Sequence, residues 1–181
     1  MAISNRDRID GMFQVMAPAM DDYIASVIGQ GDPALGAVWT KLVATKDAKK
    51  GITGKTYEPL DPQVQLRMLT ESNITAGFKS GWYPFNDTLG RAGEAFASEL
   101  KGTRDSWAHA GTFSDDDAYR ALDTGERLLR LVAATAAADQ VRAIRLNLRR
   151  VTADKADKQV LKAAVDNPEA AGLRPWRDVL P

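Results

Sequence analysis

The sequence of 181 residues contains no cysteine and a single histidine. Without cysteine the chain has no disulfide framework, no thiolate zinc site and no cysteine nucleophile. One histidine leaves too few imidazole ligands for a histidine-based metal site. We therefore expect neither a metal nor another cofactor, and any catalytic site must use that one imidazole together with other polar side chains.

Net charge, long apolar runs and a phosphate-binding glycine loop are missing as well. The 24 basic and 24 acidic residues balance, so any contact with nucleic acid needs a local patch or a groove between subunits. No apolar run approaches the length of a membrane span, and the N-terminus lacks the apolar core of a signal peptide. The absence of a P-loop excludes a nucleotidase of that type. We expect a globular, cytoplasmic protein that does not bind membranes.

The first half of the chain shows the three- and four-residue spacing of apolar side chains that is typical of helices. Ser4 is expected to cap a first helix that reaches Val27, with a kink at Pro18. A second helix is expected from Asp32-Pro33 to Val43, and a short third helix starts at Asp61-Pro62. Between the second and third helices, the lysine- and glycine-containing segment 46–58 is expected to be an exposed basic loop. The alternative to a solvated loop is that its cations contact phosphate.

The second half predicts two longer helices. One covers about Thr88 to Ala108 and places His109 in its final turn. The other opens at Ser114, where Asp117 completes an acidic variant of the capping box, and is expected to run on toward Val151. With no strand pattern anywhere, the fold class is all-α, a helical bundle.

Three arginines near the end of this last helix, Arg142, Arg145 and Arg149, form a basic ridge beside an apolar stripe. The ridge is a candidate phosphate-binding surface. The alternative is an ordinary solvated face of an amphipathic helix, and the sequence leaves both open.

The segment Arg104-Asp105-Ser106-Trp107-Ala108-His109 contains the only histidine, five positions after an arginine. Imidazole titrates near neutrality and guanidinium is a permanent cation with two parallel donors, so the pair suits proton transfer beside a phosphodiester. RNA supplies its own nucleophile, the 2′-hydroxyl, and needs only a proton acceptor, a proton donor and a cation. The alternative is structural: His109 caps a helix C-terminus and Arg104 pairs with a neighbouring acid.

Read together with Phe113 to Asp123 and Glu126 to Leu129, this segment resembles the HEPN superfamily of all-α ribonucleases and RNA-binding domains. The similarity is greatest to the subgroup at the N-termini of large prokaryotic proteins that also carry a phage-defence-type ATPase. It covers residues 85–135 well, residues 1–8 moderately and residues 30–84 poorly.

The resemblance implies a symmetric dimer in which Arg104 and His109 line a cleft between protomers and cut RNA without a metal, leaving a cyclic phosphate. Asp105 stands where relatives commonly have asparagine or another polar residue, and it would orient the imidazole or repel the phosphate. Trp107 is expected to anchor the core or the dimer interface. The rival function is a non-catalytic RNA-binding or dimerisation module that assembles or regulates an ATPase partner.

For domain organisation, we expect the HEPN-like helical domain to span residues 1–166 and residues 167–181 to form a C-terminal linker or tail. The tail contains Pro175-Trp176-Arg177, and similar segments lead into the ATPase in the relatives. The RNA target, the trigger and the partner are not encoded in any motif of this sequence.

Overall fold

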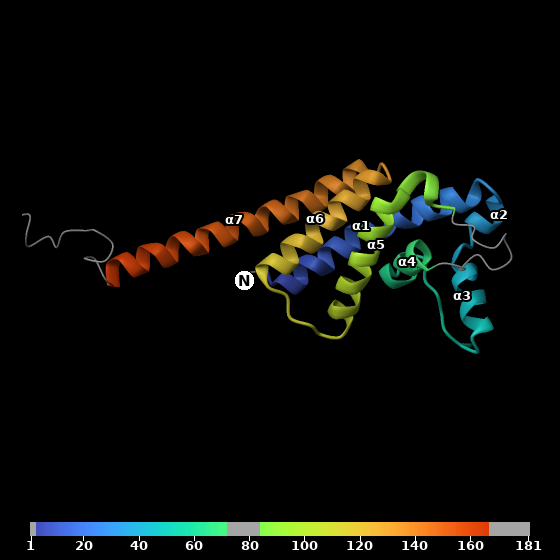
Figure 1. The fold of residues 1–181 in the computed structure, drawn as a ribbon, viewed down its shortest axis with the longest axis horizontal. Helices are drawn as coiled ribbons and strands as arrows, with labels where there is room; N and C mark the ends of the chain where they lie inside the picture. Colours follow the sequence, from blue (N-terminus) through green and yellow to red (C-terminus); the bar gives the residue numbers. More distant parts are fainter. Residues whose placement is uncertain (1–2, 72–83, 167–181) are drawn as a thin grey trace, which may run out of the picture. The chain divides into compact units, whose positions relative to one another are not determined.

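A computed structural model describes residues 3–71 and 84–166, and every regular element in these ranges is a helix (Figure 1). The all-α prediction is therefore confirmed. The helices are α1 (Asn5–Gly29), α2 (Pro33–Gly36), α3 (Thr40–Lys49), α4 (Pro62–Thr70), α5 (Asn86–Ala108), α6 (Asp115–Leu131) and α7 (Thr135–Asp166). The chain divides into two compact units, Met1–Arg145 and Leu146–Pro181. The first holds α1 to α6 and the first turns of α7, and the described part of the second is the rest of α7. The predicted tail, 167–181, lies outside the described residues.

Helix α1 supplies most of the core of the first unit. Ser4 caps its N-terminus, as the sequence predicts, and Asp7 completes a capping box that the sequence analysis did not include. The helix is one unbroken element that contains Pro18. It contacts α2, α4, α5 and α6. Its buried apolar side chains recur every three or four residues and are Ile9, Met12, Phe13, Met16, Ala17, Met20, Ile24, Val27 and Ile28.

Helix α6 packs closely against α1 because it carries a glycine at the contact. A Cβ atom added to Gly125 would lie 2.6 Å from the sulfur of Met12 and 3.2 Å from that of Met16. The capping box of Ser114 and Asp117 that opens α6 is present as predicted. Helix α5 packs on α6 and on α4, and it bends at Gly90, whose φ of 55° and ψ of −165° are not helical.

The region from Asp32 to Lys50 differs from the prediction. The expected single helix is divided into α2 and α3, because the Trp39 side chain is buried against α1 and its indole N–H donates to Asp21 at 2.7 Å. Lys46 and Lys49 are not in a loop, since α3 continues to Lys49. The exposed basic loop is therefore shorter than predicted and begins after α3.

The long helix expected from Ser114 toward Val151 is also wrong, because the chain turns between α6 and α7. Ala133 has a φ of 58°. The amide of Ala134 donates to the carbonyl of Leu129 at 2.9 Å and that of Ala133 donates to Arg130 at 3.1 Å. This hydrogen-bond pattern is the Schellman motif, which normally ends a helix with a left-handed glycine. Alanine favours helix, so the sequence hides the break.

We predict that Ala133→Gly stabilises the fold by about 1 kcal/mol, because glycine adopts the left-handed conformation without the steric cost that alanine bears. The matched control is Ala143→Gly, an exposed position in the interior of α7 where glycine is expected to cost about 1 kcal/mol. Urea unfolding of both variants measures the two effects. Equal destabilisation by both would contradict the left-handed turn.

Candidate functional site

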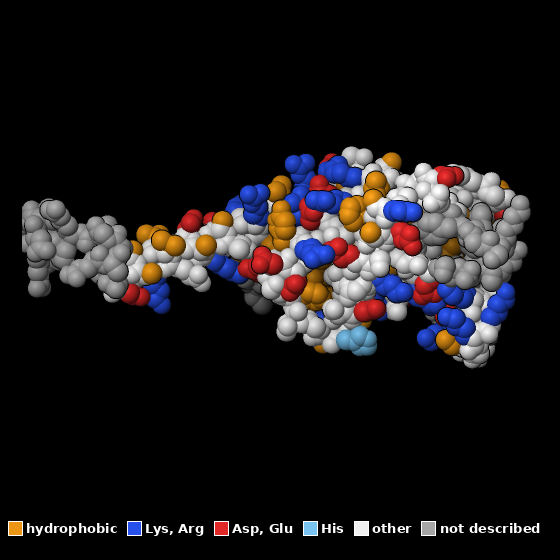
Figure 2. All heavy atoms as spheres, in the orientation of Figure 1, with side chains coloured by type: hydrophobic (Ala, Val, Ile, Leu, Met, Phe, Trp, Pro, Cys, Tyr) orange, Lys and Arg blue, Asp and Glu red, His pale blue; other side chains and the backbone are white. Residues whose placement is uncertain are grey.

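The predicted catalytic segment lies at the C-terminal end of α5. His109 is the C-cap residue, and the next residue, Ala110, has a φ of 57°. The amide of Gly111 donates to the carbonyl of Ser106 at 2.8 Å, so this end is a second Schellman motif. The His109 side chain is exposed, and Figure 2 shows it in pale blue at the surface. A fixed backbone thus presents an accessible imidazole.

The loop after His109 is held by the start of α1. The side-chain amide of Asn5 donates to the carbonyl of Phe113 at 3.2 Å and to the carboxylate of Asp115 at 2.7 Å. Because Asp115 is the first residue of α6, one asparagine joins the beginnings of two helices. These contacts limit the positions that the end of α5 can adopt.

Arg104 lies on α5 with its side chain 18% exposed. Its guanidinium is 3.7 Å from a carboxylate oxygen of Asp61 and 3.9 Å from one of Asp105. Both separations exceed hydrogen-bonding distance, and the buried Nε has no hydrogen-bond partner in the described residues. Arg104 therefore has two electrostatic partners, and none of its donors forms a hydrogen bond within the described residues.

No hydrogen bond or ion pair joins Arg104 to His109 among the described residues. Five positions on a straight helix turn two side chains about 140° apart, which is consistent with this separation. Asp105 is half exposed, and only its backbone carbonyl contacts His109, through the amide at 3.1 Å. Within one chain, the predicted catalytic residues share a helix end without forming a closed site.

Trp107 packs inside the protomer. Its ring meets that of Phe13 edge to face with centroids 6.0 Å apart, and the Arg6 guanidinium lies 5.5 Å from the ring centre. These contacts join α5 to α1, so within the chain Trp107 is a packing residue between Arg104 and His109. A role for Trp107 in a dimer interface stays a prediction.

Glu99 is neither a partner of Arg104 nor a plain solvated carboxylate. It accepts hydrogen bonds from Arg120 at 2.7 Å and from Thr124 at 3.0 Å, which join α5 to α6. The hydrogen bond from Arg120 lowers the pKa of Glu99. The sequence shows the carboxylate but not the arginine that it meets 21 positions later.

The three arginines of the predicted basic ridge on α7 differ in their exposure and in their partners. Arg145 is 15% exposed and donates to Glu126 at 2.8 Å and to the Tyr119 hydroxyl at 2.7 Å, which joins α7 to α6. Its donors are thus directed into the protein. Arg142 and Arg149 are exposed, and their predicted contact with RNA is untested.

A polar recess between α3, α4 and α5 was not anticipated from the sequence. It has a volume of about 610 Å³. Figure 2 shows blue side chains gathered over α3 and the loop that follows it. The recess is lined by Lys46, Asp47, Lys50, Ile52, Lys55, Gln63, Arg67, Thr70, Glu71 and Lys101. The sequence offered the lysines but not the fact that three helices bring them together.

Arg67 organises the floor of this recess. It donates two hydrogen bonds to Asp47, at 2.9 and 2.7 Å, and two to Glu71, at 2.6 and 3.2 Å. The hydrogen bonds from Arg67 keep the pKa of Asp47 far below its usual value. Burial raises the pKa of Glu71, but hydrogen bonds from Arg67 and Lys46 outweigh burial and lower it to about 2.

Comparison with models of protein families matches residues 11–133 to Swt1-like HEPN domains. The chain belongs to the Swt1-like HEPN family. The match extends through residues 30–84, where the resemblance read from the sequence was weakest, and it includes both Arg104 and His109. No curated protein and no solved structure matches the chain.

The HEPN match ends at residue 133, at the turn between α6 and α7. Within the described ranges of this HEPN chain, no helix is long and apolar enough to cross a membrane. The same ranges contain no group of three or more histidine, cysteine, aspartate or glutamate residues that could hold a metal ion. The candidate site of the HEPN domain therefore consists of the α5 end and, separately, the basic recess.

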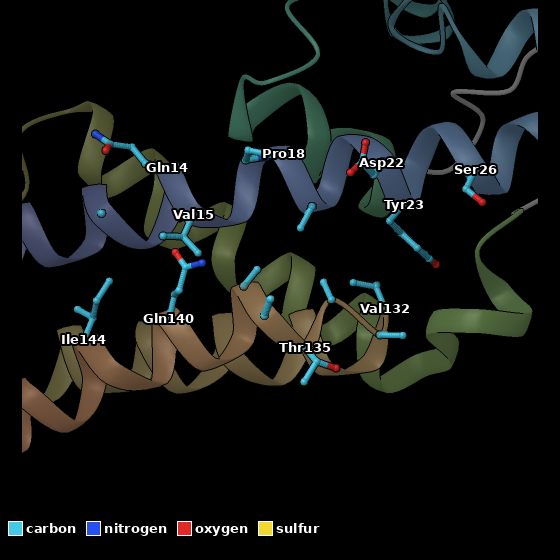
Figure 3. A pocket seen from close by; sticks show the side chains of 16 residues that line it. Gln14, Val15, Pro18, Asp22, Tyr23, Ser26, Val132, Thr135, Gln140 and Ile144 are labelled. Carbon is cyan, nitrogen blue, oxygen red and sulfur yellow. The ribbon is translucent and has the colours of Figure 1, made fainter.

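A groove between α1 and the start of α7 is larger, about 1150 Å³, but contains none of these residues (Figure 3). Its walls are mostly small or apolar, with Gly11, Val15 and Pro18 on α1 and Ala136 and Ile144 on α7. Figure 3 shows Gln14, Asp22 and Tyr23 as polar side chains along α1. The groove has no basic residue in its lining, so it does not suit a phosphate.

We predict that Arg67→Gln reduces the loss of stability in acid. A carboxylate with a lowered folded-state pKa contributes stability above its unfolded value, 4.5 for Glu71, and loses it as the pH falls toward about 2. Urea unfolding at several pH values should show the wild type and the variant furthest apart above 4.5 and converging toward pH 2. Lys41→Met, exposed on α3 outside the cluster, is the control. Parallel curves for wild type and Arg67→Gln would refute the coupling.

Proposed function

We propose that this HEPN domain is a metal-independent endoribonuclease in which Arg104 and His109 act in a groove between two copies of the chain. Membership of the Swt1-like HEPN family supports the proposal, because that family resemblance implies these roles. The observation that carries it is the state of Arg104, whose hydrogen-bond donors are uncommitted although its side chain is mostly covered. A guanidinium in this state can bind phosphate without breaking a hydrogen bond in the fold.

In the proposed reaction the 2′-hydroxyl of the RNA attacks the adjacent phosphorus. His109 of one copy accepts the hydroxyl proton as the new P–O bond forms, and the bond to the 5′-oxygen breaks. That oxygen receives a proton and leaves, and the product is a 2′,3′-cyclic phosphate. Arg104 donates hydrogen bonds to the non-bridging phosphate oxygens, where negative charge grows in the transition state.

The dimer is part of the proposal because one imidazole cannot act as base and acid in a single step. Two copies would bring two His109 side chains and two Arg104 side chains to one scissile bond. The exposure of His109 and its separation from Arg104 within one chain both suit such an arrangement. In this arrangement Asp105, half exposed beside Arg104, helps to orient the guanidinium.

The biological setting follows from the resemblance alone. We propose that the domain works in a defence or stress system beside an ATPase domain or subunit, as in the subgroup that the sequence resembles. Activity would then be controlled by that partner, and the isolated chain provides the RNA-cleaving part.

We predict that His109→Ala lowers RNA cleavage at least about 100-fold, the usual contribution of a general acid or base. Labelled RNA is incubated with pure protein in EDTA, and the products are tested for a cyclic phosphate. Arg104→Lys keeps the charge but loses the two-pronged donor, so we expect a smaller loss. Analytical ultracentrifugation of each variant checks that the proposed dimer is intact. Unchanged cleavage by His109→Ala would eliminate the nuclease.

A second candidate function is a non-catalytic assembly module, favoured by the contacts that the motif makes in the fold. Arg104 lies near Asp61, the N-cap of α4, and Trp107 packs on Phe13 of α1, so both residues also support packing. Under this alternative, wild-type protein cuts no RNA, and Trp107→Ala disturbs assembly. Cleavage by the wild type that depends on His109 would reject it.

A further inference from the structure

We infer that the recess between α3, α4 and α5 binds a phosphate of the RNA backbone and holds the strand beside Arg104. The inference deepens the proposed function and rests on it for the identity of the strand. It assigns RNA contact to Lys46, Lys50 and Lys55, which lie in the segment 46–58 that the sequence predicts as a basic loop, and to Lys101 on α5.

The recess concentrates positive charge in a chain that has no net charge. Four lysines and Arg67 line it, against two carboxylates, Asp47 and Glu71, which leaves an excess of three positive charges. Charges that face one another across a hollow raise the local concentration of anions more than the same charges spread over a surface. A backbone phosphate, with a single negative charge per nucleotide, is the matching ligand.

The two carboxylates are already neutralised inside the floor. Arg67 donates to both, and Lys46 lies 3.0 Å and Lys101 3.6 Å from Glu71. The side chains of Lys50 and Lys55, in contrast, are exposed and form no hydrogen bond or ion pair with any described residue, although the Lys50 backbone amide donates to the Asp47 carbonyl. The ion pairs around Asp47 and Glu71 therefore hold the recess together, and the ammonium groups of Lys50 and Lys55 are available to bind an anion.

Position connects the recess to the proposed catalytic arginine. Lys101 precedes Arg104 by three residues on α5, so the two side chains emerge from the same side of the helix, about 4.5 Å apart along its axis. Both form ion pairs with residues that cap α4: Lys101 with Glu71 at the C-terminal end and Arg104 with Asp61 at the N-terminal end. Gln63 of the lining follows Asp61 by two residues. Asp61 and Glu71 cap the two ends of the nine-residue helix α4, so a strand that contacts both Arg104 and the recess would run along α4.

The lining also indicates which part of RNA is bound. No aromatic ring lines the recess, and its one large apolar side chain is Ile52. Bases bound to proteins usually stack on aromatic side chains, whereas backbone phosphates need only cations and amide or hydroxyl donors. The recess therefore suits phosphate, and its contribution to binding is expected to be independent of RNA sequence.

The test measures binding of a 2′-O-methyl RNA 20-mer, which cannot be cleaved, by fluorescence anisotropy at several salt concentrations. Lys50→Glu and Lys55→Glu should each weaken binding about fivefold or more and make the salt dependence shallower by about one released counterion. Lys41→Glu makes the same charge change at an exposed position on α3 outside the recess and should alter affinity less than about twofold. Thermal unfolding checks that all three variants are folded.

Unchanged affinity in both recess variants would overturn the inference, and so would an equal loss in Lys41→Glu, which would mean a general effect of charge. A competing arm adds ATP or inorganic phosphate. Displacement of the RNA at equal phosphate concentration would assign the recess to a free nucleotide or ion instead of the strand.

The binding and cleavage results separate this inference from the nuclease. If the wild type binds through Lys50 and Lys55 but cuts no RNA, the recess stands as an RNA site and the nuclease fails. If cleavage requires His109 while binding ignores both lysines, the nuclease stands and the recess fails.

Discussion

The apolar face of α1, from Ile9 to Ile28, is the surface on which α2, α4, α5 and α6 all pack. Burying such side chains is the main source of stability in a domain of this size. Because α5 reaches this face both directly and through α6, the position of the α5 end depends on it. The contact of Trp107 with Phe13 and the hydrogen bonds of Asn5 tie that end to α1 itself. The exposed His109 is therefore held by a buried helix.

Three arginines that are largely covered differ in how their donors are used. Arg67 and Arg145 are largely covered, and their donors are used by carboxylates that they share with other cations. Such residues are structural, since removing them would leave carboxylates buried without a partner. Arg104 is covered to a similar degree but makes only longer electrostatic contacts. This difference is the reason why Arg104, and not Arg67 or Arg145, is the arginine that we propose for phosphate binding.

Several elements could be read directly from the sequence because their signals are local. The capping boxes at Ser4 and Ser114 and the Asp-Pro start at Asp61 each satisfy the free amides of a helix N-terminus within a few residues. The C-terminal ends and breaks of helices are harder to predict from the sequence. The turn at Ala133 carries no glycine, and the division between α2 and α3 depends on burial of Trp39 against a distant helix.

The candidate site likewise has features that follow from local sequence and features that depend on packing. The sequence by itself determined the helical class, the caps and the six-residue segment that carries Arg104 and His109, because these depend on the order of neighbouring residues. Only the tertiary structure decided which arginines keep free donors and which lysines share a recess. Lys46 and Lys101 are 55 positions apart in the chain and meet over Glu71 because α3, α4 and α5 pack together. Electrostatic interaction depends on distance in space, and that distance is set by packing.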